Sequence, residues 1–455
     1  HALIKILQKN TSVASASYKQ ALKLDRNNVT ALKGQAILLI KNDDLVSAQK
    51  LIDRILANDS KEIAGYFLKA NIAYRQNNLV EVENILSTAL KNVKGEINLE
   101  LPVSDGLIRL YSQKPDSKKI LSLAQDLERR YPNDSRSLSL LAKAQIFDKQ
   151  YSLGKQTLKR IISQGKQDIT HRLLLAQLYM NELDDIKEAS KLIDEALHAS
   201  PENLKALTFK TVFLTKQKQY GQAMELADQL EKKLPQSAAG KMLKADIYLA
   251  QQQLDLALDY NQKAYIIEPD FKLFNNIIGL LVALEKNEEA IRLLHDELDK
   301  NPRNLTNHFK LASLYLNKKD YGKAESHYQT ILKENPDNSV IQNNLAMVYY
   351  HQKNPKALEL AKKAYYGAPD SAAIADTYGI VLLQQGRNRE ALKVIGKAAE
   401  LAPKSLEIQL NLAEAYRVNG NQKTAIAILE KIVDDAAESV TKQTARERLK
   451  QLKAN

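Results

Sequence analysis

Small and large apolar residues recur along this chain at a fixed spacing, with polar stretches between them. A small residue is followed three positions later by a large one, often tyrosine, and about nine positions after that by a second small residue. The pattern predicts pairs of short antiparallel helices, because small residues let two helices approach closely. The first small residues are Ala36, Ala70, Ala142, Ala176, Ala245, Gly279, Ala312, Ala346, Gly379 and Ala413, and the second include Gly154, Ala223, Ala257, Ala324, Ala391 and Ala425.

Prolines mark the period of this pattern at intervals of 33 or 34 residues. Proline stops the second helix of one pair and opens the first helix of the next, and a following Asp or Asn caps that helix. We also expect a Gly or Asn in the polar turn inside each pair to end its first helix. The position, called the proline slot below, holds Pro132, Pro201, Pro235, Pro269, Pro302, Pro336, Pro369 and Pro403, with Arg26, Ser60, Lys94 and Lys166 in the same place elsewhere.

The segments "LASLYLNKKDYGKAESHYQTILKENP" (311–336) and "NLAEAYRVNGNQKTAIAILEKI" (411–432) carry the pattern most clearly. They resemble the tetratricopeptide repeat (TPR), and the resemblance covers nearly the whole chain. It implies an all-α fold, a right-handed α-solenoid (superhelix) of about 12 antiparallel TPR helix pairs. Such a fold typically binds other macromolecules.

The repeat boundaries predict five segments. They are a partial repeat (1–27), regular repeats (28–95), an irregular repeat around "EINLELPVSDGL" (96–133), regular repeats (134–438) and a charged capping helix (439–455). Because a chain that begins inside a repeat exposes an apolar stacking face, we expect a C-terminal portion of a longer protein, with His1 as a tag remnant.

Composition and charge narrow the function. The chain has 44% apolar residues, only 15 Gly and 11 Pro, which favours an all-α protein. Its net charge of +12 comes from 66 basic and 54 acidic residues, and the basic pairs are scattered. Solvated helix faces explain them better than nucleic-acid binding does. No run of 18 apolar residues predicts a membrane span.

Candidate chemistry is absent from the sequence. There is no cysteine, which is typical of an oxidising compartment and equally of chance in a Lys- and Gln-rich genome. The histidines follow no HxxxH spacing and are spread over different repeats, which disfavours a metal site. No phosphate-binding or nucleophile motif is present either. We therefore expect no catalytic residue, no metal and no cofactor.

The concave side of the solenoid is the expected binding surface. In this register, residues five to seven, eleven and fourteen to fifteen after the proline slot face it, with Asn344 and Asn411 just beyond. Side-chain amides can bind the backbone of an extended peptide, although a solvated role explains any single asparagine equally well. The candidate partner-binding residues are Asn276, Asn307, Asn343, Asn344, Tyr350, Asp376, Asn411 and Arg417.

Two binding modes known from the TPR family do not fit. In a carboxylate clamp, Lys, Asn and Arg stand at set positions. Asn71 stands at a suitable position for the asparagine, but Phe67 stands where the lysine should be. An asparagine ladder requires Asn at one position in most repeats, and here only Asn344 and Asn411 occupy that position. The apolar residues Phe209, Phe271, Met347, Tyr350 and Leu383 instead suggest anchors for an amphipathic or extended segment, although core packing explains about half of them better.

Between 354 and 379, "NPKALELAKKAY" and "APDSAAIADTYG" resemble the TPR lipoproteins that accompany bacterial exosortase (PEP-CTERM) and exopolysaccharide systems, the PrsT family. The resemblance implies a non-catalytic scaffold for envelope assembly or export, periplasmic or envelope-associated, and anchored only through a lipid on a missing N-terminal segment. The alternatives are a cytoplasmic scaffold or regulator, an RNA or polysaccharide binder, and the accessory half of an enzyme. A protein or peptide in the groove is the expected partner.

Overall fold

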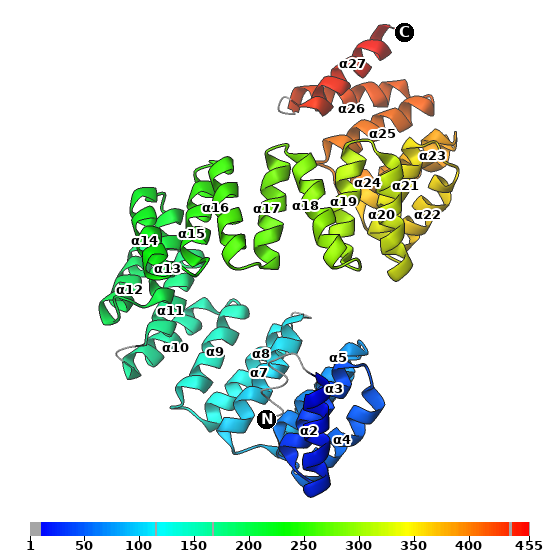
Figure 1. Cartoon of the computed structure of the whole chain (residues 1–455). Helices are drawn as coiled ribbons and strands as arrows, with labels where there is room; N and C mark the ends of the chain where they lie inside the picture. The colour runs from blue at the N-terminus through cyan, green and yellow to red at the C-terminus, as the bar shows by residue number, and fades with distance from the viewer. Residues whose placement is uncertain (1–10, 114–115, 166–167, 436–438, 455) are drawn as a thin grey trace. The chain divides into compact units, whose positions relative to one another are not determined.

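The computed structural model describes residues 11–113, 116–165, 168–435 and 439–454, and every regular element in these ranges is an α-helix (Figure 1). The predicted all-α repeat architecture is confirmed. The helix tail expected before residue 11 and the slot residue Lys166 lie outside the described residues. The helices are α2 (Thr11–Leu24), α3 (Val29–Lys41), α4 (Leu45–Asn58), α5 (Ile63–Arg75), α6 (Leu79–Asn92), α7 (Ile97–Gln113), α8 (Ser117–Arg130), α9 (Ser135–Phe147), α10 (Tyr151–Gln164), α11 (Ile169–Asn181), α12 (Ile186–Ala199), α13 (Leu204–Lys216), α14 (Tyr220–Lys233), α15 (Ala239–Ala250), α16 (Leu254–Ile267), α17 (Phe271–Ala283), α18 (Asn287–Lys300), α19 (Leu305–Asn317), α20 (Tyr321–Glu334), α21 (Ser339–His351), α22 (Lys356–Gly367), α23 (Ala372–Gln384), α24 (Asn388–Leu401), α25 (Leu406–Val418), α26 (Gln422–Asp435) and α27 (Val440–Ala454).

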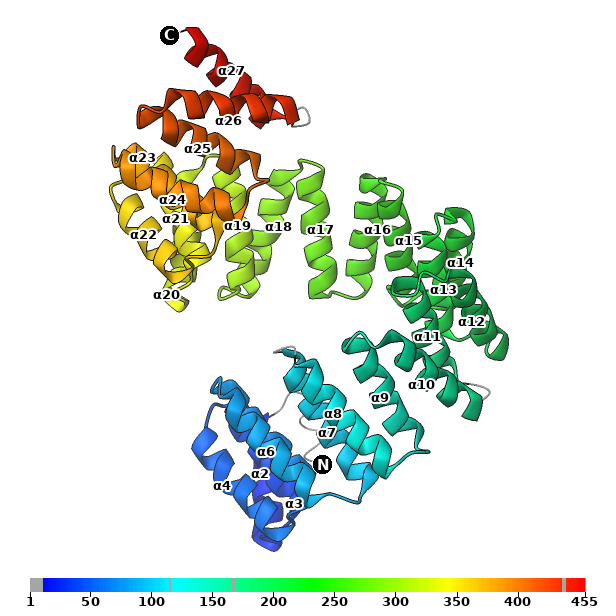
Figure 2. The same cartoon turned by 180° about the vertical axis from the view of Figure 1, so that it is seen from behind.

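The chain divides into two compact units, residues 1–250 and 251–455. In unit 1, six successive helix pairs run from α3 to α14, preceded by α2 and followed by α15. In unit 2, five pairs run from α17 to α26, preceded by α16, and α27 packs on α25 and α26 at the C-terminal end (Figure 2). The six and five described pairs come close to the predicted number of about twelve. No described helix is both long and apolar enough to cross a membrane.

Asparagine begins many first helices, as the residues after the prolines predicted. The side chain of Asn203, two residues after Pro201, accepts a hydrogen bond from the backbone N–H of Ala206 at 3.0 Å. In the same way Asn338, which stands two residues after Pro336, accepts a hydrogen bond from the backbone N–H of Ile341. Such a cap satisfies one of the backbone donors left open at a helix start and is worth about 1 kcal/mol. In these two repeats the proline and the asparagine after it together mark where the first helix begins.

The small residues of the repeat form the contacts between helices. Ala142, Ala346 and Ala324 have no exposed surface, and the nearby tyrosines Tyr315 and Tyr349 are 5% exposed. The predicted close approach of the two helices is therefore confirmed for these residues.

Gly279 is an exception to this pattern. It was expected at a helix contact, but it is exposed, and the neighbouring Ile278 lies in the core instead. The reason is the length of the preceding loop. Helix α17 begins two residues after its slot proline, Pro269, whereas each other first helix of unit 2 begins three residues after its slot proline. Every residue of α17 is thus shifted by one position relative to its proline.

The irregular repeat contains a buried charged residue where the others are apolar. Helix α7 is 17 residues long and includes Pro102. Its Glu100 has no exposed surface and accepts hydrogen bonds from the guanidinium of Arg130, the hydroxyl of Tyr131 and the backbone N–H of Gly95. A buried carboxylate is tolerated when several donors satisfy it, and these donors come from both ends of the repeat.

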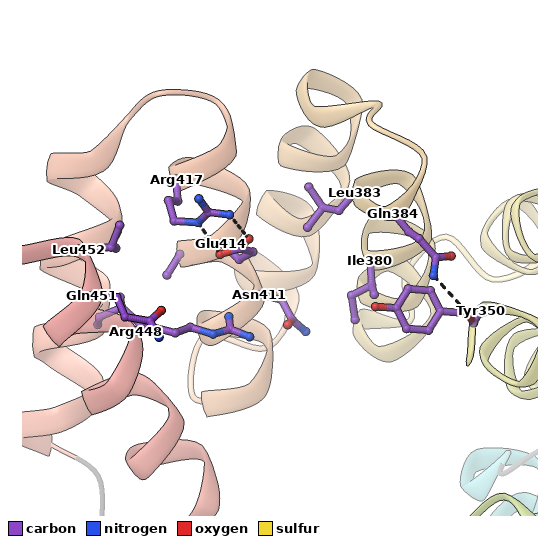
Figure 3. A pocket seen from close by; sticks show the side chains of 12 residues that line it. Tyr350, Ile380, Leu383, Gln384, Asn411, Glu414, Arg417, Arg448, Gln451 and Leu452 are labelled. Carbon is purple, nitrogen blue, oxygen red and sulfur yellow. Dashed lines mark hydrogen bonds and ion pairs between the residues drawn. The ribbon is translucent and has the colours of Figure 1, made fainter. Parts of the chain in front are cut away.

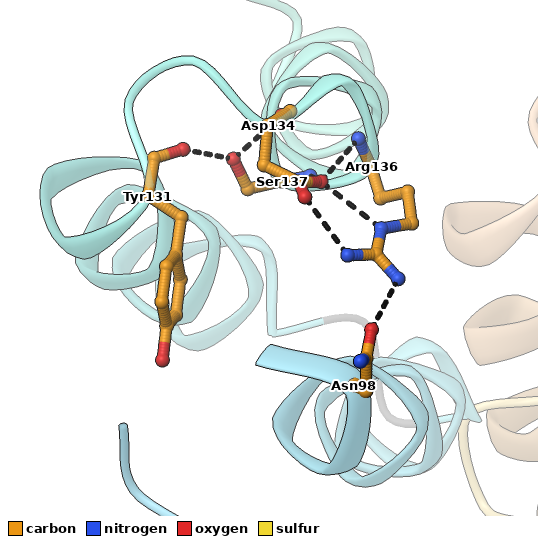
Figure 4. Close-up of polar contacts among 5 residues, drawn as sticks. All are labelled: Asn98, Tyr131, Asp134, Arg136 and Ser137. Carbon is orange, nitrogen blue, oxygen red and sulfur yellow. Dashed lines mark hydrogen bonds and ion pairs between the residues drawn. The ribbon is translucent and has the colours of Figure 1, made fainter. Parts of the chain in front are cut away.

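Polar contacts also join this repeat to the next (Figure 4). Asp134 caps α9 by accepting from the backbone N–H of Arg136 at 2.8 Å and that of Ser137 at 3.4 Å. The Arg136 guanidinium donates to Asp134 and to the side-chain oxygen of Asn98 on α7, the latter at 2.8 Å. The Ser137 hydroxyl donates to the backbone oxygen of Tyr131 at 2.6 Å. These bonds fix how the first helices α7 and α9 lie beside each other.

The turns inside the pairs need one residue with positive φ. The prediction that Gly or Asn fills this place is correct for Gly386, Gly420 and Asn77. It is wrong for most turns, in which another residue has the positive φ, as Lys149 (φ 60°) and Lys319 (φ 60°) do. Such a conformation costs an ordinary residue about 1–2 kcal/mol. The packing of the two helices that the turn joins outweighs this cost.

Candidate partner-binding pocket in the C-terminal unit

A pocket of about 580 Å³ lies in unit 2 among helices α21, α23, α25, α26 and α27 (Figure 3). Apolar side chains form part of its wall and amides and charged groups form the rest. This mixture is typical of ligand sites, in which a few polar groups orient a partner against an apolar surface. The lining consists of Tyr350, Ile380, Leu383, Gln384, Asn411, Ala413, Glu414, Arg417, Leu429, Arg448, Gln451 and Leu452.

Helical spacing brings the lining residues to one face. Asn411, Glu414 and Arg417 follow at intervals of three on α25, and Ile380 and Leu383 do so on α23. Residues three or four positions apart share one side of a helix. Each first helix therefore presents one stripe to the pocket.

Helix α27 completes the wall with Arg448. Ala445 has no exposed surface and packs, together with Leu449, into the apolar core between α25 and α26, which fixes the orientation of α27. Arg448 extends from α27 toward Asn411 (Figure 3). Its guanidinium donates one long hydrogen bond, 3.4 Å, to the backbone oxygen of Leu410. No carboxylate among the described residues forms an ion pair with Arg448.

The other pocket arginine is already paired. Arg417 donates from Nε and Nη2 to the two oxygens of Glu414 at 2.8 and 2.6 Å. This contact lowers the pKa of Glu414, and the positive charge of Arg448 lowers it further against the effect of burial. Glu414 and Arg417 thus neutralise each other at neutral pH. Arg448 remains as the cation that can bind a partner.

Asp376 on α23 contacts the pocket residue Asn411 but does not itself line the pocket. The side-chain amide of Asn411 donates to Oδ2 of Asp376 at 2.9 Å. The other oxygen, Oδ1, is buried and has no hydrogen-bond partner. Burial raises the pKa of Asp376 to about 6, partly offset by the Asn411 bond, and the negative charge of Glu407 raises it as well. A desolvated carboxylate with an open oxygen is a candidate for binding rather than for stability.

Further polar side chains continue from Asp376 along the first helices of unit 2. The ammonium of Lys310 on α19 donates to the side-chain oxygen of Asn275 on α17. On α21, Asn343 donates to Asn344 at 3.3 Å, and its own Oδ1 is buried without a partner. We call this set the polar row, and its members are Asn275, Lys310, Asn343, Asn344, Asp376 and Asn411.

The structure brings most of the predicted site residues together. Tyr350, Asn411 and Arg417 line the pocket. Asn343, Asn344 and Asp376 belong to the polar row beside it. Of the predicted apolar anchors, Tyr350 and Leu383 also contribute to the pocket wall.

Asn307 was predicted incorrectly, since it has no exposed surface. It stands five residues after its proline, a position that faces the second helix of the preceding repeat. Two glycines at the same position show this directly. A Cβ on Gly65 would meet Leu56 of α4, and one on Gly240 would meet Glu231 of α14. Position five is therefore a packing position and cannot contact a partner.

Asn276 is exposed on α17 but lies outside the polar row. The shift of α17 by one residue puts Asn275 at the position that Asn343 and Asp376 occupy in later repeats, and Asn276 at the position of Asn344 and Asn411. Lys310 accordingly contacts Asn275.

Two charged residues of this region were missed. Arg448 belongs to α27, which was predicted only as a charged helix that caps the last repeat, although the spacing of Arg448 from Gln451 and Leu452 indicates a shared face. Lys310 stands at the position of the asparagine ladder, which this sequence does not form. The feature of the sequence that could have identified Lys310 is a lysine at a position that amides and apolar residues fill in the other repeats.

The histidines also differ from expectation. Three of them, predicted to stay apart, meet in unit 2 on α18, α19 and α20. Nδ1 of His308 lies 2.8 Å from Nδ1 of His327, and the ring centroids of His295 and His327 are 5.8 Å apart. Burial, together with the charges of His308 and His295, lowers the pKa of His327 to about 4. Even so, no group of three His, Cys, Asp or Glu in the described part of the chain is arranged to hold a metal ion.

A second pocket, of about 460 Å³, lies in unit 1 and includes Phe67 and Asn71, the two residues tested for a carboxylate clamp. Two of its three lining cations make contacts within the described chain, and Lys41 forms no ion pair there. Lys33 pairs with Glu62 at 3.3 Å, and Arg75 donates to the backbone oxygen of Ile40. The pocket in unit 2 is the stronger candidate site because three of the predicted site residues line it.

Comparison with known families agrees with the helix pattern. A model described as tetratricopeptide repeat matches residues 181–247, 281–348 and 382–454. These three segments of the chain are tetratricopeptide repeats. The last matched TPR segment carries α25 and α27 and hence most of the charged lining of the pocket.

Known proteins with similar sequences include ER membrane protein complex subunit 2-A of Xenopus laevis and subunit 2 of Xenopus tropicalis. Each is 28% identical over 144 residues, which are 31% of this chain and 48% of the relative. The chain thus spans about half the length of the curated relatives it matches. The PrsT resemblance stays a prediction.

Two solved structures are similar in their helices. The crystal structure of the APC/C hetero-tetramer Cut9-Hcn1 aligns over 99% of this chain and 95% of that chain, with 13% identity and a TM-score of 0.41. A TPR protein from Parabacteroides merdae aligns over 48% of this chain and 88% of that chain, with 20% identity and a TM-score of 0.43.

Proposed function

We propose that this chain is a non-catalytic scaffold that binds a protein partner, and that the partner docks in the pocket among α21, α23, α25 and α27. The observation that carries the proposal is the pocket lining. It combines apolar walls, at Ile380 and Leu383, with a guanidinium, at Arg448, that no carboxylate of the described chain engages. Interfaces gain most of their affinity from such partly desolvated arginine and apolar anchors.

Binding, rather than catalysis, suits the groups present. The described lining contains no serine, histidine or lysine that could act as a nucleophile or base. Its only carboxylate, Glu414, is held by Arg417, and that bond keeps the pKa low. A general base needs a pKa near the working pH, so Glu414 is poorly suited to that role.

The lining also favours a peptide over a nucleic acid. A surface that binds phosphates needs several free cations close together. Here Arg417 is neutralised by Glu414, and Arg448 stands beside apolar residues. The excess of basic residues in the whole chain is not concentrated at this pocket.

For the cellular setting, we propose a bacterial envelope system of the exopolysaccharide or protein export type, with a lipid anchor outside this sequence. The residues quoted for the PrsT resemblance and the lack of cysteine support this setting. A cytoplasmic scaffold is the alternative. Fractionation of the source cells with an antibody against the chain tests it, because recovery in the cytoplasm would contradict the envelope setting.

Site-specific photo-crosslinking in the source cells tests the docking site. The photoreactive residue p-benzoylphenylalanine replaces Leu383 in the pocket wall, and in a matched control it replaces Tyr366, which is 68% exposed on α22. We expect one discrete cross-linked protein from the Leu383 position that the Tyr366 position does not give. The same product from both positions, or none from Leu383, would reject the pocket as the docking site.

A further inference from the structure

Two residues of the polar row carry opposite charges that are not paired. Lys310 is half-buried, its ammonium donates to the amide oxygen of Asn275, and burial lowers its pKa. Asp376 is half-buried too, and only one of its oxygens is engaged, by Asn411. Within the described residues, no ion pair includes either of them.

Unpaired charges of this kind are costly, because a charge withdrawn from water loses its hydration without compensation. The surrounding repeats show that pairing was available. Lys318, which directly follows α19, pairs with Glu288, and Lys286 pairs with Asp255 at 2.6 Å. The two unpaired charges therefore stand out within unit 2, and a partner that supplied the missing charges would recover part of their cost.

The residues between these charges offer hydrogen bonds to a main chain. Asn343 and Asn344 lie on α21, between α19 and α23 in the order of the first helices. Oδ1 of Asn343 is buried and accepts no hydrogen bond, although its amide group donates to Asn344. An acceptor left open in this way suits a backbone N–H of an extended peptide.

We propose that the polar row binds an extended peptide segment that brings a carboxylate to Lys310 and a basic side chain to Asp376, with Asn343 accepting from its backbone. This inference rests on the proposed function and names the class of partner. The segment is a continuation of whatever occupies the pocket, because Asn411 belongs both to the pocket lining and to the row.

The helix spacing fixes how far apart the two charges on the peptide stand. Neighbouring helices pack about 8–10 Å apart, so two steps from α19 to α23 span roughly 16–20 Å. An extended chain rises about 3.3 Å per residue. The acidic and the basic residue of the partner should thus be separated by about five or six positions.

Selection from a random-peptide phage library on the full chain tests this. We expect enriched peptides to share an acidic and a basic residue at that separation. Lys310→Met should remove the preference for the acidic residue only, and Asp376→Asn the preference for the basic residue only. Enriched peptides without the charge pair, or with the same pair on all variants, would overturn the inference.

Matched controls alter exposed charges nearby. Lys333→Met changes an exposed lysine on α20, and Asp370→Asn changes a carboxylate whose side chain is 89% exposed before α23. Both should select the same peptides as the unaltered chain. In a second measurement, fluorescence anisotropy with a selected peptide, replacing its basic residue by norleucine should weaken binding at least about tenfold, and no loss would contradict the role of Asp376.

The same selection separates this inference from the proposed function. Arg448→Gln alters the pocket but not the row. If it weakens peptides that lack the charge pair, the pocket binds and the inference alone fails. If no selected peptide responds to Arg448→Gln, or if none is enriched, the proposed docking site fails as well.

Discussion

The amide of Asn411 holds one oxygen of the Asp376 carboxylate at 2.9 Å, and the second oxygen of that carboxylate has no partner. The two residues stand on neighbouring first helices, α25 and α23. One hydrogen bond from an amide stabilises the charged carboxylate less than burial destabilises it. The pKa of Asp376 therefore rises to about 6. The relationship indicates a residue retained for binding at a cost in stability.

This cost predicts that Asp376→Asn stabilises the chain at neutral pH. The folded pKa of about 6 lies above the unfolded value of 3.8, so wild-type stability falls, relative to the variant, as pH rises from about 4 to 6. At 1.36 kcal/mol per pKa unit, the gain at pH 7.5 is at most about 3 kcal/mol. Thermal unfolding at pH 7.5 and pH 4 checks this, and the gain should vanish at pH 4.

Asp370→Asn is the control for that experiment, since its carboxylate is 89% exposed and its loss should change the melting temperature little. A variant Asp376→Asn that is less stable than wild type at pH 7.5 would show that the carboxylate supports the fold instead.

Arg448→Gln should abolish or strongly weaken partner capture while leaving the melting temperature unchanged. The guanidinium makes only one long bond within the described chain, so its loss removes little internal stabilisation. Pull-down of the cross-linked partner measures the effect. Arg389→Gln, an equivalent change of an exposed arginine on α24, should retain capture. Equal capture by both variants would argue against the pocket.

Ala346→Leu should destabilise unit 2 by roughly 1–3 kcal/mol. Ala346 has no exposed surface at the contact of two helices, so three added heavy atoms force the helices apart. Ala373→Leu on α23 adds the same atoms at an exposed position and should stay within about 0.5 kcal/mol of wild type. Urea unfolding distinguishes the two, and an equally small effect for Ala346→Leu would mean that the helix register is wrong.

The same substitution, lysine to glycine, should have opposite effects at two positions. Lys319 occupies a turn with φ 60°, where glycine is favoured, so Lys319→Gly should stabilise by about 0.5–1 kcal/mol. Lys393 lies exposed within α24, where glycine costs about 1 kcal/mol. Melting temperatures measured in parallel check the signs, and a loss at both positions would refute the argument about the turn.

Much of the fold could be predicted because it depends on local chemistry. The proline slot, the cap at Asn203 and the buried Ala346 each follow from the requirements of one helix pair. Counting from the proline failed where the loop length changed, as at Gly279 on α17, and where a position faces the preceding repeat, as at Asn307.

The candidate site was only partly predictable. The spacing of Asn411 and Arg417 on one helix could be read from the sequence. The contribution of Arg448 could not, because it depends on how α27 packs against α25 through Ala445. The contact of His308 with His327 likewise depends on the angle between α19 and α20, which the sequence pattern does not specify.

The central claim is that a protein partner occupies the pocket of unit 2, and single-thiol protection tests it most directly. The chain has no cysteine, so Gln384→Cys at the pocket and Ser326→Cys on α20 each give one reactive thiol. With the cross-linked partner at saturation, maleimide labelling of the Gln384→Cys thiol should be blocked, and labelling of the Ser326→Cys thiol should be unchanged. Unaltered labelling of the Gln384→Cys thiol would contradict the claim.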